Sequence, residues 1–136
     1  MWSKAVKRIL VVDDDPAMTQ LARLRLEAAG GYEVFTENRG SRAVEVARKC
    51  RPDLIVLDVM MPDMLGNDVA EAFHADPELR HIKVVFLTSM VRKGEERRSG
   101  QDIVIAKPID ADELLATIER ELAQKTFGPA VSDLPK

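Results

Sequence analysis

The sequence predicts an α/β fold, in which one parallel sheet is covered by helices on both faces. Five short apolar runs alternate with segments in which apolar residues recur at helical spacing. Two of the runs, at 9–12 and 54–57, are apolar without a break, which is typical of strands buried on both faces. A chain of 136 residues is also long enough to bury one core of this kind.

The first half of the chain supplies three of the expected strands and two of the helices. The run at 9–12 is followed by Asp15 and Pro16, a good helix start because aspartate caps the first turn and proline fits the first helical position. That helix is expected to stop at Gly30 and Gly31. A less buried strand then follows at 32–36, a helix that opens at 40–41 and runs to 50, and the central strand at 54–57.

The second half continues the same alternation. A third helix is indicated around 69–73, a fourth strand at 83–87, a fifth strand at 103–106, and a final helix with buried positions between 114 and 122. Asp110 and Glu113 have the spacing of a capping box at the start of that final helix. Residues 92–99 show almost no apolar periodicity, so a helix there would have no face to bury. We therefore expect that helix to be short or mobile.

Composition limits the class of protein and its partners. The formal net charge is −3, which argues against the basic face that nucleic-acid binding requires. The single cysteine, Cys50, falls in a helical stripe and suits a reducing compartment. No apolar run approaches the length of a membrane span, and residues 1–7 lack the apolar core of a signal peptide. We expect a cytoplasmic protein with one domain over 1–125, followed by a flexible tail at 126–136.

Acidic side chains follow two strands that should be neighbours in the sheet. The doubly wound, flavodoxin-like strand order 2-1-3-4-5 places the first and third strands side by side. Asp13 and Asp14 follow the first strand, and Asp58 ends the third. Three carboxylates at one edge would repel one another, and a hard divalent cation would remove that conflict. An all-oxygen site with few protein ligands suits Mg²⁺.

Two further polar residues follow the remaining strands at the same edge. Lys107 contributes a positive charge, and Thr88 contributes a hydroxyl donor. Together they outline a pocket for an anion that arrives at Asp58, where a cation and an ammonium group would neutralise phosphoryl oxygens in transit. Asp58 is the expected nucleophile, because aspartate carboxylates can form an acyl phosphate.

Each of these residues also has an ordinary structural explanation. Asp15 is best interpreted as a helix cap, and Asp58 on its own could start a turn. Lys107 could be a solvated loop lysine and Thr88 a strand-end hydroxyl. The functional interpretation is favoured because each of the candidate residues follows directly after an apolar run, on the same expected edge of the sheet.

Four motifs together resemble the receiver domain of two-component response regulators. They are Val-Val-Asp-Asp-Asp-Pro, Leu-Ile-Val-Leu-Asp-Val-Met-Met-Pro-Asp-Met-Leu-Gly, Phe-Leu-Thr-Ser and Ala-Lys-Pro-Ile, in the order and spacing of that family. The resemblance covers about residues 7–125. Any one motif alone would be weak, whereas the four jointly are highly specific.

The resemblance implies a role for each matched residue. Asp58 would take a phosphoryl group from a phosphohistidine of a sensor histidine kinase or a histidine phosphotransfer protein. Asp14 and Asp58 would bind Mg²⁺ directly, with the backbone carbonyl of Met60, while Asp13 would hold metal-bound water. Lys107 would pair with phosphoryl oxygens. Thr88 would move to hydrogen-bond the phosphoryl group, and that movement would signal the modification to an effector protein.

Two features depart from the pattern of the family. Val104 stands three residues before the matched lysine, where the family usually carries Tyr or Phe. The segment between Thr88 and Lys107 is shorter than usual and polar. The face that commonly docks partners, built by the fourth helix, fifth strand and fifth helix, is therefore expected to be altered.

Three functions remain to be compared. The first is a stand-alone receiver, which is a phosphoacceptor switch rather than an enzyme; a phosphorelay intermediate or a receiver fragment of a larger regulator is its close variant. The second is a Mg²⁺-dependent phosphatase with an aspartyl phosphate, which would need a second aspartate where this chain has Met60. The third is a degenerate receiver that binds partners constitutively. The complete set of polar residues at the strand ends favours the first.

Overall fold

A computed structural model of the chain describes residues 6–90, 92, 97–99, 102–107 and 109–124. The predicted flexible tail at 126–136, and the domain boundary at 125, lie outside the described residues.

The sheet confirms the predicted parallel core. Its strand order is β2-β1-β3-β4-β6-β5, and the pairs β1–β2, β1–β3, β3–β4 and β4–β6 are all parallel. Because β6 occupies the fifth place, the predicted order 2-1-3-4-5 holds for the five parallel strands. The strands are β1 (Lys7–Val12), β2 (Tyr32–Glu37), β3 (Leu54–Asp58), β4 (Lys83–Thr88), β5 (Arg97–Ser99) and β6 (Asp102–Ala106).

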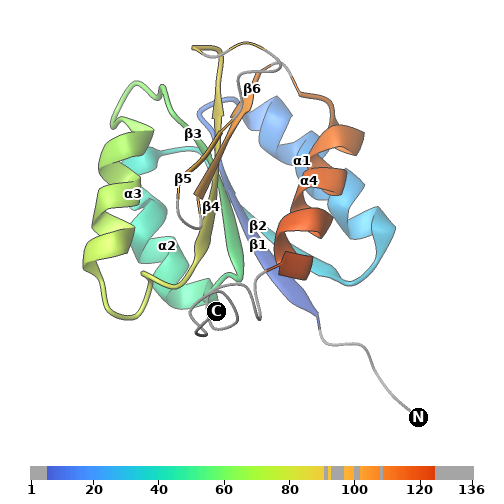
Figure 1. Cartoon of the computed structure of the whole chain (residues 1–136), viewed down its shortest axis with the longest axis horizontal. Helices are drawn as coiled ribbons and strands as arrows, with labels where there is room; N and C mark the ends of the chain where they lie inside the picture. The colour runs from blue at the N-terminus through green and yellow to red at the C-terminus, as the bar shows by residue number, and fades with distance from the viewer. Residues whose placement is uncertain (1–5, 91, 93–96, 100–101, 108, 125–136) are drawn as a thin grey trace, which may run out of the picture.

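Helices cover both faces of the sheet, as the sequence predicts (Figure 1). The helices α1 (Pro16–Ala29) and α4 (Ala111–Gln124) lie on one face. The short 3₁₀ helix η1 (Gly40–Arg42), α2 (Ala43–Cys50) and α3 (Gly66–Ala75) lie on the other. Two apolar clusters fill the layers between the helices and the sheet, and successive residues of β1 and β3 contribute to alternate clusters. All five residues of β3 are buried, which explains the unbroken apolar run at 54–57.

Both helix starts predicted from capping residues are confirmed. The Asp15 carboxylate accepts the N–H of Ala17 at 3.0 Å and caps α1. At the start of α4, the Asp110 N–H donates to the Glu113 carboxylate at 3.1 Å, and the Glu113 N–H donates to the Asp110 carboxylate at 2.8 Å. This reciprocal pair is the capping box.

The expectation of a helix within 92–99 is wrong for the part of that segment that the structure describes. Arg97–Ser99 form the short strand β5, which pairs antiparallel with β6 at the edge of the sheet. A helix needs an apolar face to bury, whereas an edge strand needs only backbone partners along its neighbour. The polar sequence therefore suits an edge strand. Among the described residues between β4 and β6 there is no helix.

One ion pair is buried on the α4 side of the sheet. Lys83, at the start of β4, donates to the Glu121 carbonyl at 2.8 Å and lies 3.7 Å from its carboxylate. Both side chains are almost fully buried. The pair joins the beginning of a central strand to the end of α4, and burial makes removal of one partner costly.

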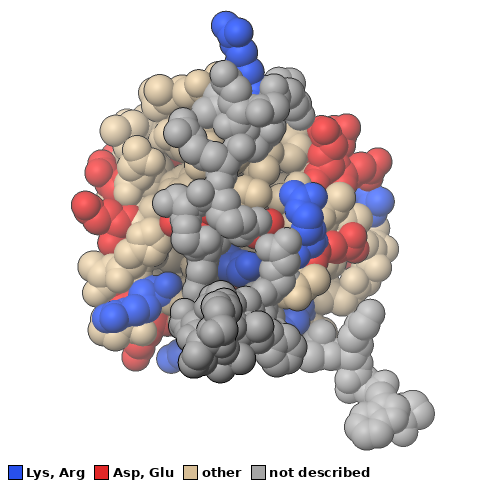
Figure 2. Space-filling view, in the orientation of Figure 1, with Lys and Arg blue, Asp and Glu red and all other residues tan. Residues whose placement is uncertain are grey.

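The surface carries charges of both signs. On the face shown in Figure 2, basic and acidic side chains of the described residues are interspersed, both at the rim and near the middle. This distribution agrees with the small net charge of −3.

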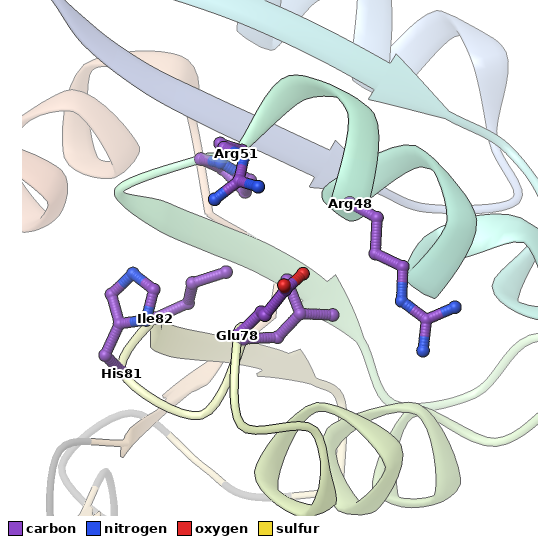
Figure 3. A pocket seen from close by; sticks show the side chains of 7 residues that line it. Arg48, Arg51, Glu78, His81 and Ile82 are labelled. Carbon is purple, nitrogen blue, oxygen red and sulfur yellow. The ribbon is translucent and has the colours of Figure 1, made fainter.

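A hollow of about 80 Å³ lies at the edge where the strands begin, away from the candidate polar residues. It is lined by the connections that precede β3 and β4. Arg51 comes from the first of these connections and Glu78 from the second (Figure 3). Arg48, which also lines it, is paired with the Asp76 carboxylate at 2.8 Å. The opposite edge, where the strands end, is the edge at which open α/β sheets bind ligands.

Gly66 brings the start of α3 against the end of β3. Its N–H donates to the Val59 carbonyl at 2.7 Å. A Cβ at position 66 would lie 2.5 Å from the Asp58 carbonyl oxygen and 2.8 Å from the Val59 Cα. Both are backbone atoms that no change of rotamer can move, so the close approach requires glycine.

We therefore expect Gly66→Ala to lower the free energy of unfolding by roughly 1–3 kcal/mol, because the added methyl overpacks this contact. Asn67→Ala, at the next and exposed position of α3, is the matched control and should change it by no more than about 0.5 kcal/mol. Urea denaturation followed by circular dichroism measures both. Equal stability of the two variants would contradict the steric argument.

Candidate functional site

The ends of β1 and β3 bring three carboxylates together. The two strands pair in register up to Val12 and Leu57, so the residues that follow them, Asp13 and Asp58, are neighbours. Carboxylate oxygens of Asp13, Asp14 and Asp58 all lie within 4.8 Å of one another. Asp13 and Asp58 are buried, whereas Asp14 is exposed. The carboxylates predicted from the sequence to meet at one edge of the sheet therefore do so.

Lys107 reaches the cluster from β6, on the far side of β4. Its Nζ lies 3.2 Å from an Asp13 carboxylate oxygen and 3.3 Å from an Asp58 carboxylate oxygen. Its backbone N–H donates to the Thr88 carbonyl at 2.8 Å, which fixes the start of the side chain beside the end of β4. One ammonium group thus bridges two buried carboxylates.

The balance of burial and neighbouring charges raises the pKa values of both Asp58 and Lys107. Burial raises the pKa of Asp58, and the nearby Asp13 carboxylate raises it further, against the opposing effect of Lys107. Partial burial disfavours the charged form of Lys107, but the Asp13 and Asp58 carboxylates outweigh that effect and raise the pKa of Lys107. At neutral pH the lysine is therefore charged, and the negative charge of Asp58 is unfavourable where it stands.

Thr88 ends β4 one residue beyond the pairing of Asp58 with Leu87. The side chain is buried, and its hydroxyl oxygen accepts the N–H of Met90 at 3.0 Å. The hydroxyl proton remains available for donation. The structure thus places Thr88 at the end of the strand next to β3, as the sequence predicts.

Backbone and amide groups fix the carboxylates in place. One Asp58 oxygen accepts the N–H of Met60 at 3.3 Å, and the Asp13 Oδ1 accepts the N–H of Asp15 at 2.9 Å. The Asp13 carbonyl accepts the side-chain N–H of Asn38 at 2.7 Å. Sequence analysis did not single out Asn38, because no motif marks a contact between residues 25 positions apart.

The cluster fits a hard divalent cation. Three carboxylates offer oxygen ligands within a small volume, and one of them is exposed, which leaves room for water ligands. Burial raises the pKa of Asp58 first and the Asp13 carboxylate second, while Lys107 offsets part of both effects. A bound cation would remove the remaining repulsion.

Comparisons with known proteins agree on one family. Residues 9–119 match the family described as the response regulator receiver domain. The chain is 36% identical over 119 residues to the polar-differentiation response regulator DivK of Brucella anthropi, an alignment that covers 85% of this chain and 96% of that protein.

Solved structures agree with the sequence matches. The chemotaxis protein CheY4 of Vibrio cholerae has a TM-score of 0.74 and 32% identity, covering 85% of this chain and 98% of that chain. The signal receiver domain of a histidine kinase from Syntrophus aciditrophicus has a TM-score of 0.74 and 30% identity, covering 89% of this chain and 93% of that chain.

The raised pKa of Asp58 yields a test of the electrostatics. A folded-state pKa above the unfolded value means that the folded protein holds the proton longer, so stability falls as pH rises above about 4. Asp58→Asn removes this penalty. In EDTA at pH 7 the variant should melt at a higher temperature than the unaltered protein, and the difference should shrink toward pH 4.

Asp63→Asn is the matched control, because backbone N–H donation by Ser41 and Gly40 lowers the pKa of that carboxyl group. A carboxyl group whose pKa is lowered in the folded state stabilises the protein at pH values above its unfolded-state pKa. Asp63→Asn should therefore melt at a lower temperature at pH 7. Differential scanning calorimetry measures all three proteins. A lower melting temperature for Asp58→Asn would show that attraction to Lys107 dominates over burial and repulsion.

Proposed function

The chain belongs to the response regulator receiver domain family, and on that premise we propose that Asp58 is its phosphoryl acceptor. The proposal rests on one observation: a buried carboxylate at the end of the central strand lies 3.3 Å from the Lys107 ammonium group. Two further carboxylates stand within 4.8 Å of it. This arrangement suits the transfer of a phosphoryl group to an aspartate oxygen.

In the proposed transfer, an Asp58 carboxylate oxygen attacks phosphorus, and the bond between phosphorus and the donor histidine nitrogen breaks. The imidazole leaves with the bonding electrons. Lys107 stays protonated and offsets the charge of the phosphoryl oxygens. Mg²⁺, when bound, would supply further positive charge at those oxygens. We propose that Asp13, Asp14, Asp58 and the backbone carbonyl of Met60 would hold it, with Asp13 acting through water.

Thr88 would report the modification. Its hydroxyl accepts a hydrogen bond from Met90 in this structure and can donate its own proton to a phosphoryl oxygen. Val104, which is half-buried, carries no ring that could turn inward with it. We propose that the signal passes to an effector protein through the segment from Met90 to Arg98.

The donor and the setting are also inferred. A sensor histidine kinase or a histidine phosphotransfer protein is the proposed phosphoryl donor, in the cytoplasm. In the described part of the chain, no helix has the length and apolar character to cross a membrane. A receiver within a phosphorelay or a larger regulator is the second candidate, since one of the similar structures is the receiver domain of a histidine kinase.

A switch is favoured over a phosphatase. The phosphatase mechanism requires a second carboxylate two residues after the nucleophile, and that position is Met60, whose side chain is 56% exposed. No general acid is available there to protonate a leaving group. We infer that the protein accepts one phosphoryl group and does not turn over phosphoesters.

Phosphoramidate with Mg²⁺ should label the protein with one phosphoryl group, and Asp58→Asn should abolish the labelling. Lys107→Ala should slow labelling by roughly 100-fold or more, because it removes a charge aimed at the transferred group. Mass spectrometry of the intact protein measures the extent and the rate. Labelling of Asp58→Asn to the same extent, or repeated turnover of p-nitrophenyl phosphate, would contradict the proposal.

The phosphorylated form should last for minutes or longer rather than seconds. Met60 and Met90 each stand two residues beyond a site residue, and apolar side chains at those places would restrict attacking water. Replacing both with alanine should speed the loss of the phosphoryl group. The decay of the labelled protein after removal of phosphoramidate measures this, and a half-life of seconds in the unaltered protein would refute it.

A further inference from the structure

The connection from β2 to η1 is bonded to the loop that follows β1. The Asn38 side-chain N–H groups reach the Asp13 carbonyl at 2.7 Å and the Thr19 hydroxyl oxygen at 3.1 Å. The Asp13 N–H donates to the Glu37 carbonyl at 3.1 Å. These contacts tie residues 37–38 to the loop that carries Asp13 and Asp14.

The same connection is bonded on its other side to the loop that follows β3. The Asp63 carboxylate accepts the N–H of Gly40 at 3.1 Å with one oxygen and the N–H of Ser41 at 3.0 Å with the other. The buried Met61 side chain packs on Gly40, where a Cβ would lie 2.9 Å from the Met61 Cε. These contacts tie residues 40–41 to the loop that carries Met60.

The connection is itself held in one conformation. One oxygen of the Glu37 carboxylate accepts the N–H of Asn38 at 3.1 Å and the N–H of Arg39 at 3.0 Å. A short segment braced in this way can hold two loops at a set spacing, because a change in its conformation would break these hydrogen bonds.

We propose that Asn38 and Asp63 are positioning residues, which clamp the two ligand-bearing loops on either side of the cation site. Asp13 and Asp58 are placed directly by the paired ends of β1 and β3. Asp14 and Met60 stand one and two residues farther along, beyond the ladder of hydrogen bonds. Their spacing therefore depends on the loops, and ligand oxygens must be held to within about 0.5 Å for tight binding.

This inference shares one assumption with the proposed function, namely that the carboxylate cluster binds Mg²⁺. A purely structural role for Asp63, as a cap for η1, would affect stability but not cation affinity. Asp76 provides the comparison, because its carboxylate also accepts a backbone N–H, from Glu78 at 2.9 Å, and pairs with Arg48. It lies past the end of α3, in the connection to the start of β4.

The test is Mg²⁺ binding to the full chain by isothermal titration calorimetry, at a temperature where every variant is folded by circular dichroism. Asn38→Ala and Asp63→Ala should each weaken Mg²⁺ binding by roughly 10-fold, and the double variant should weaken it more than either. Asp63→Asn should fall between Asp63→Ala and the unaltered protein, because its amide oxygen can still accept a backbone N–H. Asp76→Ala should bind Mg²⁺ as the unaltered protein does.

A second measurement needs no cation. Amide hydrogen exchange in EDTA should be faster at Met60 in Asp63→Ala than in Asp76→Ala, because the loop has lost its anchor. Unchanged Mg²⁺ affinity in both clamp variants, or an equal loss in Asp76→Ala, would overturn this inference while leaving the proposed function intact. Failure of the unaltered protein to bind Mg²⁺ would overturn both.

Discussion

Two carboxylates at the ends of adjacent parallel strands are held close together in a partly buried site, and one ammonium group bridges them. Asp13 and Asp58 are held side by side, because β1 and β3 pair up to the residues directly before them. Lys107 lies 3.2 and 3.3 Å from the two carboxylates and offsets part of their repulsion. Lys107 neutralises only part of the charge of the three carboxylates, so the site would favour a bound cation, and an added phosphoryl group would change its charge strongly.

The rest of the fold keeps that charge in place. The interior of the sheet packs against an apolar cluster on each face, and the polar residues of the site follow where the strands end. Gly66 brings the start of α3 so close to the Asp58 carbonyl that a Cβ would not fit between them. The loops beyond the strand ends are then tied to a common segment through Asn38 and Asp63.

The edge of the sheet differs from the pattern of the family. The resemblance implies a docking face built by the fourth helix, fifth strand and fifth helix, whereas the described residues here place the short strand β5 beside β6. Val104 of β6 pairs with Phe86 of β4 and remains half-buried.

The sequence alone determined the order of the elements and the chemistry at the strand ends. Both are local properties: unbroken apolar runs at 9–12 and 54–57 mark buried strands, and a polar residue directly after such a run falls at the sheet edge. Asp58, Lys107 and the caps at Asp15 and Asp110 could be predicted for that reason. Tertiary structure alone decided that 97–99 is a strand, that Lys83 is buried with Glu121, and that Asn38 and Asp63 join the two loops. These features depend on partners as far as 38 residues away along the chain, and no periodicity in the sequence records such contacts.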